Sequence, residues 1–197
     1  MTDRFCSQCG ATLVAKMEGG RERPACPSCG HVVFGHFSVG VGGLLVHDGK
    51  VLLVQRGEDP GKGRWTIPGG YVEQDEPPDE ALAREVLEET GLRARPVGIL
   101  AIRHAPVKDS QNAYIVFGME LVGPPGDLKP EGNGKEIARA GFFAPREFAA
   151  LGDMGLISRW LAEHHRPGDA VLRRLPDDVQ HSIRVGSGWI ALFGITE

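Results

Sequence analysis

The sequence of 197 residues has no apolar run that approaches the roughly 18 residues of a membrane-spanning helix. Its first ten residues, MTDRFCSQCG, contain no apolar segment of the kind found in a secretion signal. It also has no internal repeat and no low-complexity segment. These absences argue against a membrane, secreted or repeat protein. They predict a cytoplasmic globular enzyme or binding protein.

The chain has no strong overall charge, because its formal net charge is only −4. One short stretch, residues 69–92, nevertheless contains eight acidic residues and one basic residue, so the rest of the chain sums to +3. The acidic residues are Glu73, Asp75, Glu76, Asp79, Glu80, Glu85, Glu88 and Glu89. Because so many negative charges in one short stretch repel one another, we expect a cation to lie there.

Cysteine is also scarce, and its four copies form two Cys-x2-Cys pairs separated by sixteen residues. They are Cys6, Cys9, Cys26 and Cys29. This spacing predicts one tetrahedral zinc site, with a structural role. Two disulfides are the alternative, but they are disfavoured because the cysteines of a chain without a secretion signal should stay reduced. Nucleic-acid binding by this module is disfavoured too, since only three basic residues, Lys16, Arg21 and Arg23, follow the first cysteine pair.

The composition along the chain predicts three parts. Residues 1–35 form the cysteine module, residues 37–150 an α/β domain, and residues 151–197 a C-terminal helix and extension of unknown role. Within the second part, Asp48-Gly49 between two apolar runs predicts a hairpin. Strands are expected at 96–105 and 112–123, a broken helical segment at 145–166, and one late strand in the tail.

A helix is predicted over residues 78–90, with prolines at its start and Gly91 after its end. At 100° per residue, Glu85, Glu88 and Glu89 share one face. We expect Ala83, Val86 and Leu87 to pack on a sheet from the other side. Hard divalent ions such as Mg²⁺ prefer oxygen ligands, so the acidic face predicts such a site. A solvated acidic surface is the alternative that spacing alone leaves open.

The pattern around this helix resembles the Nudix box at every defined position. The matching residues are Gly70, Glu76, Arg84, Glu85, Val86, Glu88, Glu89, Gly91 and Leu92. Together with the four-cysteine module, the chain resembles the zinc-ribbon Nudix hydrolases, which include FAD and NADH pyrophosphatases. The resemblance implies a Nudix α/β/α sandwich with a mixed sheet. It also implies hydrolysis of a nucleoside diphosphate linked to another group, with Mg²⁺ or Mn²⁺.

The resemblance further implies a role for each residue of the box. The metal ligands would be the carboxylates of Glu85, Glu88 and Glu89 and the carbonyl of Gly70. Arg84 would orient the glutamates, and Glu76 would brace the loop. The family often uses one more glutamate from a later loop. Glu136 is the candidate and Glu131 the second choice, with an ordinary exposed glutamate as the alternative.

The substrate is expected to be a small dinucleotide such as FAD, ADP-ribose or an NADH-like molecule. FAD is placed before NADH because the motif of NADH-cleaving relatives is missing from 101–114. Arg103, His104 and Tyr71 are candidates for substrate binding. The alternative for Arg103 and His104 is that they are ordinary polar residues of a loop. A nucleotide- or RNA-binding module with little turnover is the alternative function. The resemblance leaves a homodimer open.

Overall fold

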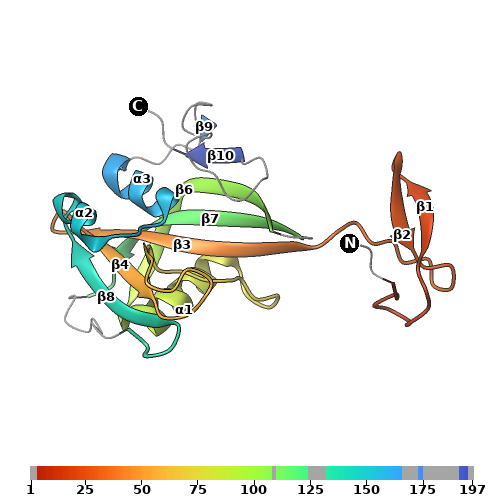
Figure 1. Ribbon diagram of the computed structural model, residues 1–197, viewed down its shortest axis with the longest axis horizontal. Helices are drawn as coiled ribbons and strands as arrows, with labels where there is room; N and C mark the ends of the chain where they lie inside the picture. Colours follow the sequence, from red (N-terminus) through yellow and green to blue (C-terminus); the bar gives the residue numbers. More distant parts are fainter. Residues whose placement is uncertain (1–3, 108–109, 124–131, 166–172, 175–190, 195–197) are drawn as a thin grey trace.

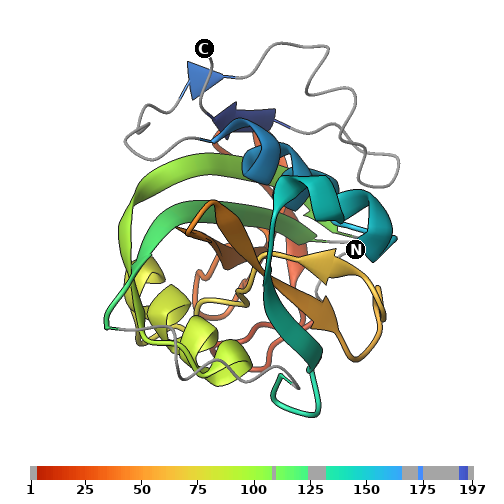
Figure 2. The ribbon, with the colours of Figure 1, turned by 90° about the vertical axis from the view of Figure 1, so that its left-hand side faces the viewer.

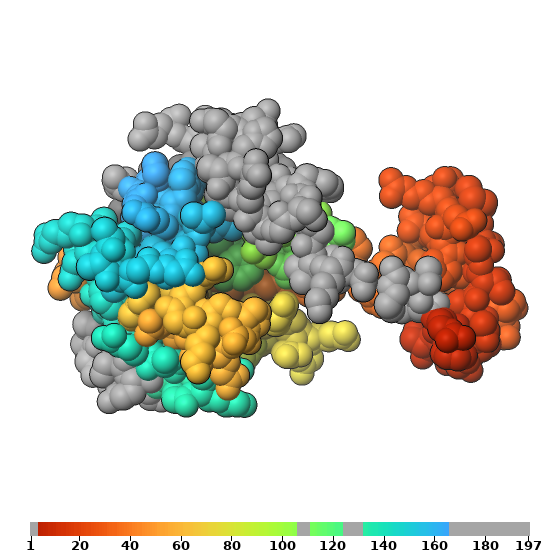
Figure 3. Space-filling view, viewed as in Figure 1, coloured from red at the N-terminus to blue at the C-terminus, as the bar shows by residue number. Residues whose placement is uncertain are grey.

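The computed structural model describes residues 4–107, 110–123, 132–165, 173–174 and 191–194. A small N-terminal module containing β1 (Val14–Glu18) and β2 (Arg21–Ala25) stands apart from the main body (Figure 1). An extended segment joins it to β3 (Phe37–His47), the strand that enters the main body. The space-filling view shows the same separation (Figure 3). Candidate residue Glu131 lies outside the described residues.

The main body contains a mixed sheet with short helices around it. After β3 its elements are β4 (Lys50–Arg56), β5 (Trp65–Thr66), α1 (Pro78–Thr90), β6 (Ala94–Val107), β7 (Ser110–Leu121), β8 (Ile137–Phe143), η2 (Pro145–Glu147), α2 (Phe148–Leu151), α3 (Leu156–His164), β9 (Arg173–Arg174) and β10 (Ala191–Gly194). The strand order is β5-β4-β3-β7-β6-β10-β9, and β8 pairs with β4. Strands β3 and β7 are parallel and the other pairs are antiparallel.

The β3–β4 hairpin forms where Asp48-Gly49 predicts it. Asp48 has φ 49° and Gly49 φ 69°, the two positive angles that a type I′ turn requires. The turn brings Val46 opposite Val51, so both strands of the hairpin enter the sheet in one register. The hairpin prediction is confirmed.

Helices cover both faces of the sheet, with α1 on one side and α3 on the other (Figure 2). Leu82 and Val86 of α1 belong to a core cluster with Leu45 of β3. Leu44, the next residue back along β3, belongs to the opposite cluster with Leu161 of α3. Neighbouring strand residues point to opposite faces, so one strand supplies both cores. The predicted α/β/α sandwich is confirmed.

Helix α1 begins and ends where predicted, but its buried side differs from the expected one. Pro78 lies in its first turn, and Gly91 closes it in the left-handed conformation with its N–H donated to the Leu87 carbonyl, 2.9 Å away. Val86 is fully buried, whereas the Leu87 side chain is 40% exposed. The buried stripe continues from Val86 to Glu89, so packing of Leu87 on the sheet was wrong. One of the three glutamates therefore lies on the buried side.

Two short strands follow α3. Strand β10 pairs antiparallel with β6, placing Leu192 opposite Arg103 in register, and β9 pairs with β10. Strand β10 lies in the tail segment for which one late strand was predicted. None of the described helices is long and apolar enough to cross a membrane.

Candidate functional site

The acidic side of α1 faces the turn that follows β5. Glu89 is only 6% exposed, and its Oε2 accepts the backbone N–H of Gly69 at 2.9 Å. The Glu85 carboxylate lies against Gly70, where a Cβ would come within 2.4 Å of Glu85 Oε1. The Gly70 carbonyl accepts the N–H of Val41 at 2.8 Å and keeps its second lone pair for another partner. Helix and turn thus bring two carboxylates and a carbonyl together.

The electrostatics of this group favour a bound cation. Burial raises the pKa of Glu89 to about 8, and the negative charges of Glu85 and Glu136 add to this effect. Burial also raises the pKa of Glu85. The exposed Glu136 therefore lies within electrostatic reach of Glu85 and Glu89. Its backbone is held in place because its carbonyl accepts the Gly57 N–H at 2.7 Å. Burial and mutual repulsion both penalise ionised carboxylates here, and a divalent cation would relieve both.

Arg84 is the positive charge at the centre of the box. Its guanidinium contacts Glu76 at 2.6 Å, Glu85 at 3.0 Å and Glu88 at 3.4 Å. These contacts raise its pKa, with the hydrogen bond to Glu76 as the largest cause. Glu76 also accepts the backbone N–H of Glu73 at 3.1 Å, which ties the loop to the helix. Glu88 is the most exposed of the three helix glutamates, so it is the one most open to an incoming ligand.

The donor set fits a hard divalent ion, because it consists of carboxylate and carbonyl oxygens. Within the described part of the chain, the glutamates do not form a closed cage. Among the described histidine, cysteine, aspartate and glutamate side chains, only the four cysteine thiols of the N-terminal module form a group of three or more whose ligand atoms all lie within 4.8 Å of one another. An open carboxylate set suits ions that complete their shell with water and substrate phosphate oxygens.

A cavity of about 710 Å³ adjoins the glutamates at Gly69 and Gly70. Its volume is in the range of nucleotide-sized pockets. The charged and polar side chains that line it are Arg56, Arg64, Thr66, Tyr71, Arg103, Asn112, Tyr114, Asp153 and Ser158. Tyr71 and Arg103, two predicted substrate-binding residues, are among them. His104, the third, follows Arg103 on β6, where alternation turns it toward the other face of the sheet.

Several lining residues were not found from the sequence. Asn112 is buried within an apolar strand, and Ser158 is buried in α3, where its Oγ accepts the N–H of Ile67 at 3.3 Å. The sequence feature that could have identified Asn112 and Ser158 is a polar residue inside an otherwise apolar segment. The glycines of β3 offered another signal, since a glycine inside a strand indicates a close approach.

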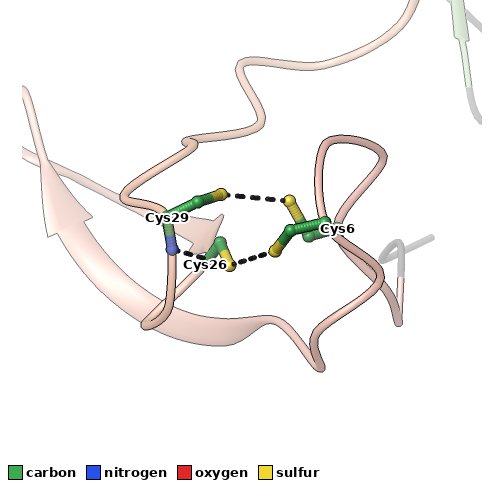
Figure 4. Close-up of side chains that lie close together, drawn as sticks. Cys6, Cys26 and Cys29 are labelled. Carbon is green, nitrogen blue, oxygen red and sulfur yellow. Dashed lines mark hydrogen bonds between the residues drawn. The ribbon is translucent and has the colours of Figure 1, made fainter.

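The four cysteines form a second cluster, in the N-terminal module (Figure 4). All four are free thiols, with Sγ–Sγ distances of 3.6 Å for Cys6–Cys29 and 3.4 Å for Cys9–Cys26. Four thiolates about 2.3 Å from a tetrahedral zinc lie about 3.8 Å apart, so the spacing fits that ion. The backbone N–H of Cys29 and then that of Ser28 lower the pKa of Cys26 to about 6, which favours its ligand form.

The two cysteine knuckles have the same backbone construction. Gly10 donates its N–H to the Cys6 carbonyl at 2.8 Å, and Gly30 donates to the Cys26 carbonyl at 3.0 Å. Both glycines have positive φ, 75° and 78°. This conformation favours glycine and turns each pair of thiols inward. The repeated knuckle is the structural basis of the predicted metal site.

Comparison with known proteins agrees with this geometry. Residues 36–163 match the NUDIX domain family, and residues 4–34 match the zinc-ribbon family described as Nudix N-terminal. The chain is 38% identical over 103 residues to an ADP-ribose pyrophosphatase of Methanocaldococcus jannaschii, covering 51% of this chain and 60% of that protein. It is 31% identical over 160 residues to the NAD-capped RNA hydrolase NudC of Stutzerimonas stutzeri, covering 81% of this chain and 55% of that protein.

A solved structure extends the similarity to the whole fold. The crystal structure of a NUDIX hydrolase from Nitrosomonas europaea superposes with a TM-score of 0.70 at 26% identity, covering 86% of this chain and 96% of that one. The chain spans between about half and three fifths of the length of the two curated relatives above.

Proposed function

Because the chain belongs to the Nudix family, we propose that it hydrolyses the diphosphate linkage of a nucleoside diphosphate joined to another group. The observation that carries the proposal is the buried Glu89 beside Glu85 and Gly70, at the mouth of a nucleotide-sized cavity. The two curated relatives named above support it, since they are an ADP-ribose pyrophosphatase and an NAD-capped RNA hydrolase. Their substrates share an adenosine diphosphate bonded to a second group. We take residues 37–150 as the catalytic domain.

The glutamates would hold Mg²⁺ or Mn²⁺, and Gly70 would offer its carbonyl. Bound there, the ions supply charge neutralisation for the diphosphate and acidify a water molecule. Glu88 and Glu89 would be the main ligands, with Glu85 beside them. Glu136, within electrostatic reach of the other carboxylates, would be the further glutamate of the site and a candidate to accept a proton from the attacking water. The thiols of the N-terminal module would hold a structural Zn²⁺, which supplies folding energy to a module too small for its own core.

The remaining residues orient and bind. Arg84 fixes the rotamers of Glu85 and Glu88 through its two contacts. Arg103 and Tyr71 line the cavity and would receive the nucleotide part of the substrate. A role for His104 stays a prediction, as do the order FAD before NADH, a cytoplasmic location and a homodimer.

A substrate panel tests the reaction. Purified protein with Mg²⁺ or Mn²⁺ is assayed on FAD, NADH, NAD, ADP-ribose, diadenosine polyphosphates and nucleoside triphosphates. We expect a dinucleotide or ADP-ribose to give the highest kcat/KM, with AMP among the products. Nucleoside triphosphates turned over far better than any dinucleotide would contradict the substrate class. Binding of several nucleotides without turnover would instead favour the binding-module alternative.

Two matched glutamine variants test the site. Glu89→Gln keeps shape and volume but removes a charge, so kcat at saturating Mg²⁺ should fall by roughly two to four orders of magnitude. Glu80→Gln, an exposed glutamate of the same helix, should leave kcat nearly unchanged. Equal kcat for Glu89→Gln and the unmodified protein would mean that the acidic face is only a solvated surface.

A further inference from the structure

The cavity beside the glutamates contains a cation that has no carboxylate partner among the described residues. Among the described residues that line the cavity, Asp153 is the only acidic one, and it pairs with Arg64 at 2.8 Å. Arg56 donates its Nε to the Pro60 carbonyl at 2.8 Å. Arg103 makes no ion pair within the described part of the chain, and its buried Nε has no hydrogen-bond partner there. The floor of the cavity therefore has an uncompensated positive charge.

The Arg103 guanidinium is held in place by the two strands that form this floor. Arg103 on β6 lies opposite Tyr114 on β7, and its guanidinium carbon lies 5.0 Å from the centre of the Tyr114 ring. Its Nη2 donates to Asn112 Oδ1. The Asn112 amide is in turn fixed, because its Nδ2 donates to Ser38 Oγ at 2.9 Å and the residue is only 5% exposed. Nη2 is thus occupied and Nε is enclosed, while the Arg103 side chain still lines the cavity and keeps its charge there.

Two glycines of β3 make this arrangement possible. A Cβ at Gly42 would lie 2.4 Å from the Tyr114 hydroxyl, and one at Gly40 would lie 2.8 Å from the Tyr114 ring. The Tyr114 ring therefore rests directly on the β3 backbone, and Arg103 rests on the ring. A glycine inside a strand commonly marks such a close approach.

Tyr114, whose ring supports Arg103, is influenced by the carboxylates of α1. Burial raises the pKa of Tyr114 above its ordinary value, and the charges of Glu89 and Glu85 add to this while the charge of Arg103 opposes it. Tyr114 is thus within electrostatic reach of both the acidic and the basic group. A buried cation without a partner is costly, and an arriving anion removes that cost. A guanidinium also matches phosphate oxygens through parallel N–H donors.

We propose that Arg103, positioned by Asn112 and supported by Tyr114, is the receptor for the phosphate group on the cavity side of the substrate. Asn112 is a positioning residue: it acts through Arg103 and touches no reacting atom. The identity of the substrate rests on the proposed function, but phosphate recognition by this site does not require turnover. The same site retains the mononucleotide product until it leaves the cavity.

Binding of AMP and of adenosine, measured by titration calorimetry, tests the site without catalysis. The buffer is depleted of magnesium by chelating resin and contains no soluble chelator, and zinc content is checked afterwards so that the N-terminal module stays intact. We expect the protein to bind AMP at least about tenfold more tightly than adenosine, the effect of one charge-assisted hydrogen bond. Equal affinities for AMP and adenosine would overturn the proposal.

Three substitutions assign the effect to the arginine and its support. Asn112→Asp is nearly isosteric and places a carboxylate beside Arg103, so AMP binding should weaken about tenfold while adenosine binding stays the same. Arg103→Lys keeps the charge but loses the planar guanidinium and its contact with Asn112, and the same loss is expected. Arg95→Met removes an exposed arginine of the same strand and should change neither affinity. Asn112→Asp that binds AMP as well as the unmodified protein would overturn the positioning role.

Kinetics separate this proposal from the proposed function. With the preferred substrate, Asn112→Asp should raise KM about tenfold and change kcat little, since the contact is made in the bound state as well as the transition state. A loss of kcat at unchanged KM would contradict a phosphate receptor. Absence of turnover on the whole panel, together with phosphate-selective AMP binding, would refute the hydrolase and leave the receptor standing.

Discussion

Glu89 should make the stability of this protein depend on pH in a direction opposite to that of an ordinary salt-bridged carboxylate. Its pKa is about 8 in the folded protein, against 4.5 for an unperturbed glutamate. A folded-state pKa above the unfolded value means that the unfolded chain releases its proton first as pH rises. The contribution of this group is therefore fully present below about pH 4.5 and is lost as pH rises toward about 8.

The size of the effect follows from the same two values. Each unit of difference in pKa corresponds to about 1.4 kcal/mol, so the free energy of unfolding should fall by at most about 5 kcal/mol across the window because of Glu89. Glu89→Gln has no proton to lose and can still accept the Gly69 N–H. The variant should equal the unmodified protein in stability near pH 5 and exceed it by several kcal/mol near pH 8.

The assay is urea unfolding followed by tryptophan fluorescence at half-unit steps from pH 5 to pH 9. Trp65 is buried and Trp160 partly buried in the main body, and the third tryptophan, Trp189, lies outside the described residues. Residues 1–35 contain no tryptophan, so the signal excludes the ribbon. The buffer is magnesium-free but retains zinc. The difference between the two curves isolates Glu89, because other titrating groups are common to both proteins.

Added Mg²⁺ supplies the internal control. A ligand that binds only the folded state stabilises it, and an ionised carboxylate binds the ion better than a protonated one. Mg²⁺ should therefore stabilise the unmodified protein more at pH 8 than at pH 5.5, and should stabilise Glu89→Gln less. Parallel stability curves for the two proteins from pH 5 to pH 9 would refute the reasoning.

Two further predictions concern the ribbon and the helix. Elemental analysis should find about one zinc per chain. Cys6→Ser should lower the zinc content and expose the ribbon to proteolysis, while the tryptophan signal of the main body stays native. Two disulfides found by mass spectrometry would contradict this prediction. Val86→Ala should lower the free energy of unfolding by about 2 kcal/mol and Leu87→Ala by less than about 0.5 kcal/mol, because Val86 is fully buried and Leu87 is not. Urea unfolding measures both values, and equal losses would contradict the observed orientation of α1.

The elements that the sequence predicted are those encoded by neighbouring residues. Asp48-Gly49 defines its hairpin through its own backbone angles, and Pro78 and Gly91 mark the ends of α1 through the first and last turn. The resemblance to the Nudix box added the acidic site, because that motif lies within one loop and one helix. The fold class followed from the same resemblance and is confirmed by the two-sided sheet.

The features that could not be predicted from the sequence depend on contacts between distant parts of the chain. Strand β8 pairs with β4, and no local turn signal indicates that pairing. The cavity floor requires Ser38 to meet Asn112, 74 residues later. Leu87 was assigned to the buried side because helical spacing defines a face but not its direction. In the structure the sheet buries Val86 and the adjoining Glu89, which places a carboxyl where an apolar side chain was expected.

Strand β3 connects the N-terminal ribbon directly to the floor of the cavity. The ribbon is joined to the body through the extended segment that runs into β3, and the first described β3–β7 pair is Phe37 with Gln111 (Figure 1). The next residue, Ser38, holds Asn112 and through it Arg103. The segment that carries the ribbon and the residues that hold the Arg103 side chain are thus neighbours along a single strand.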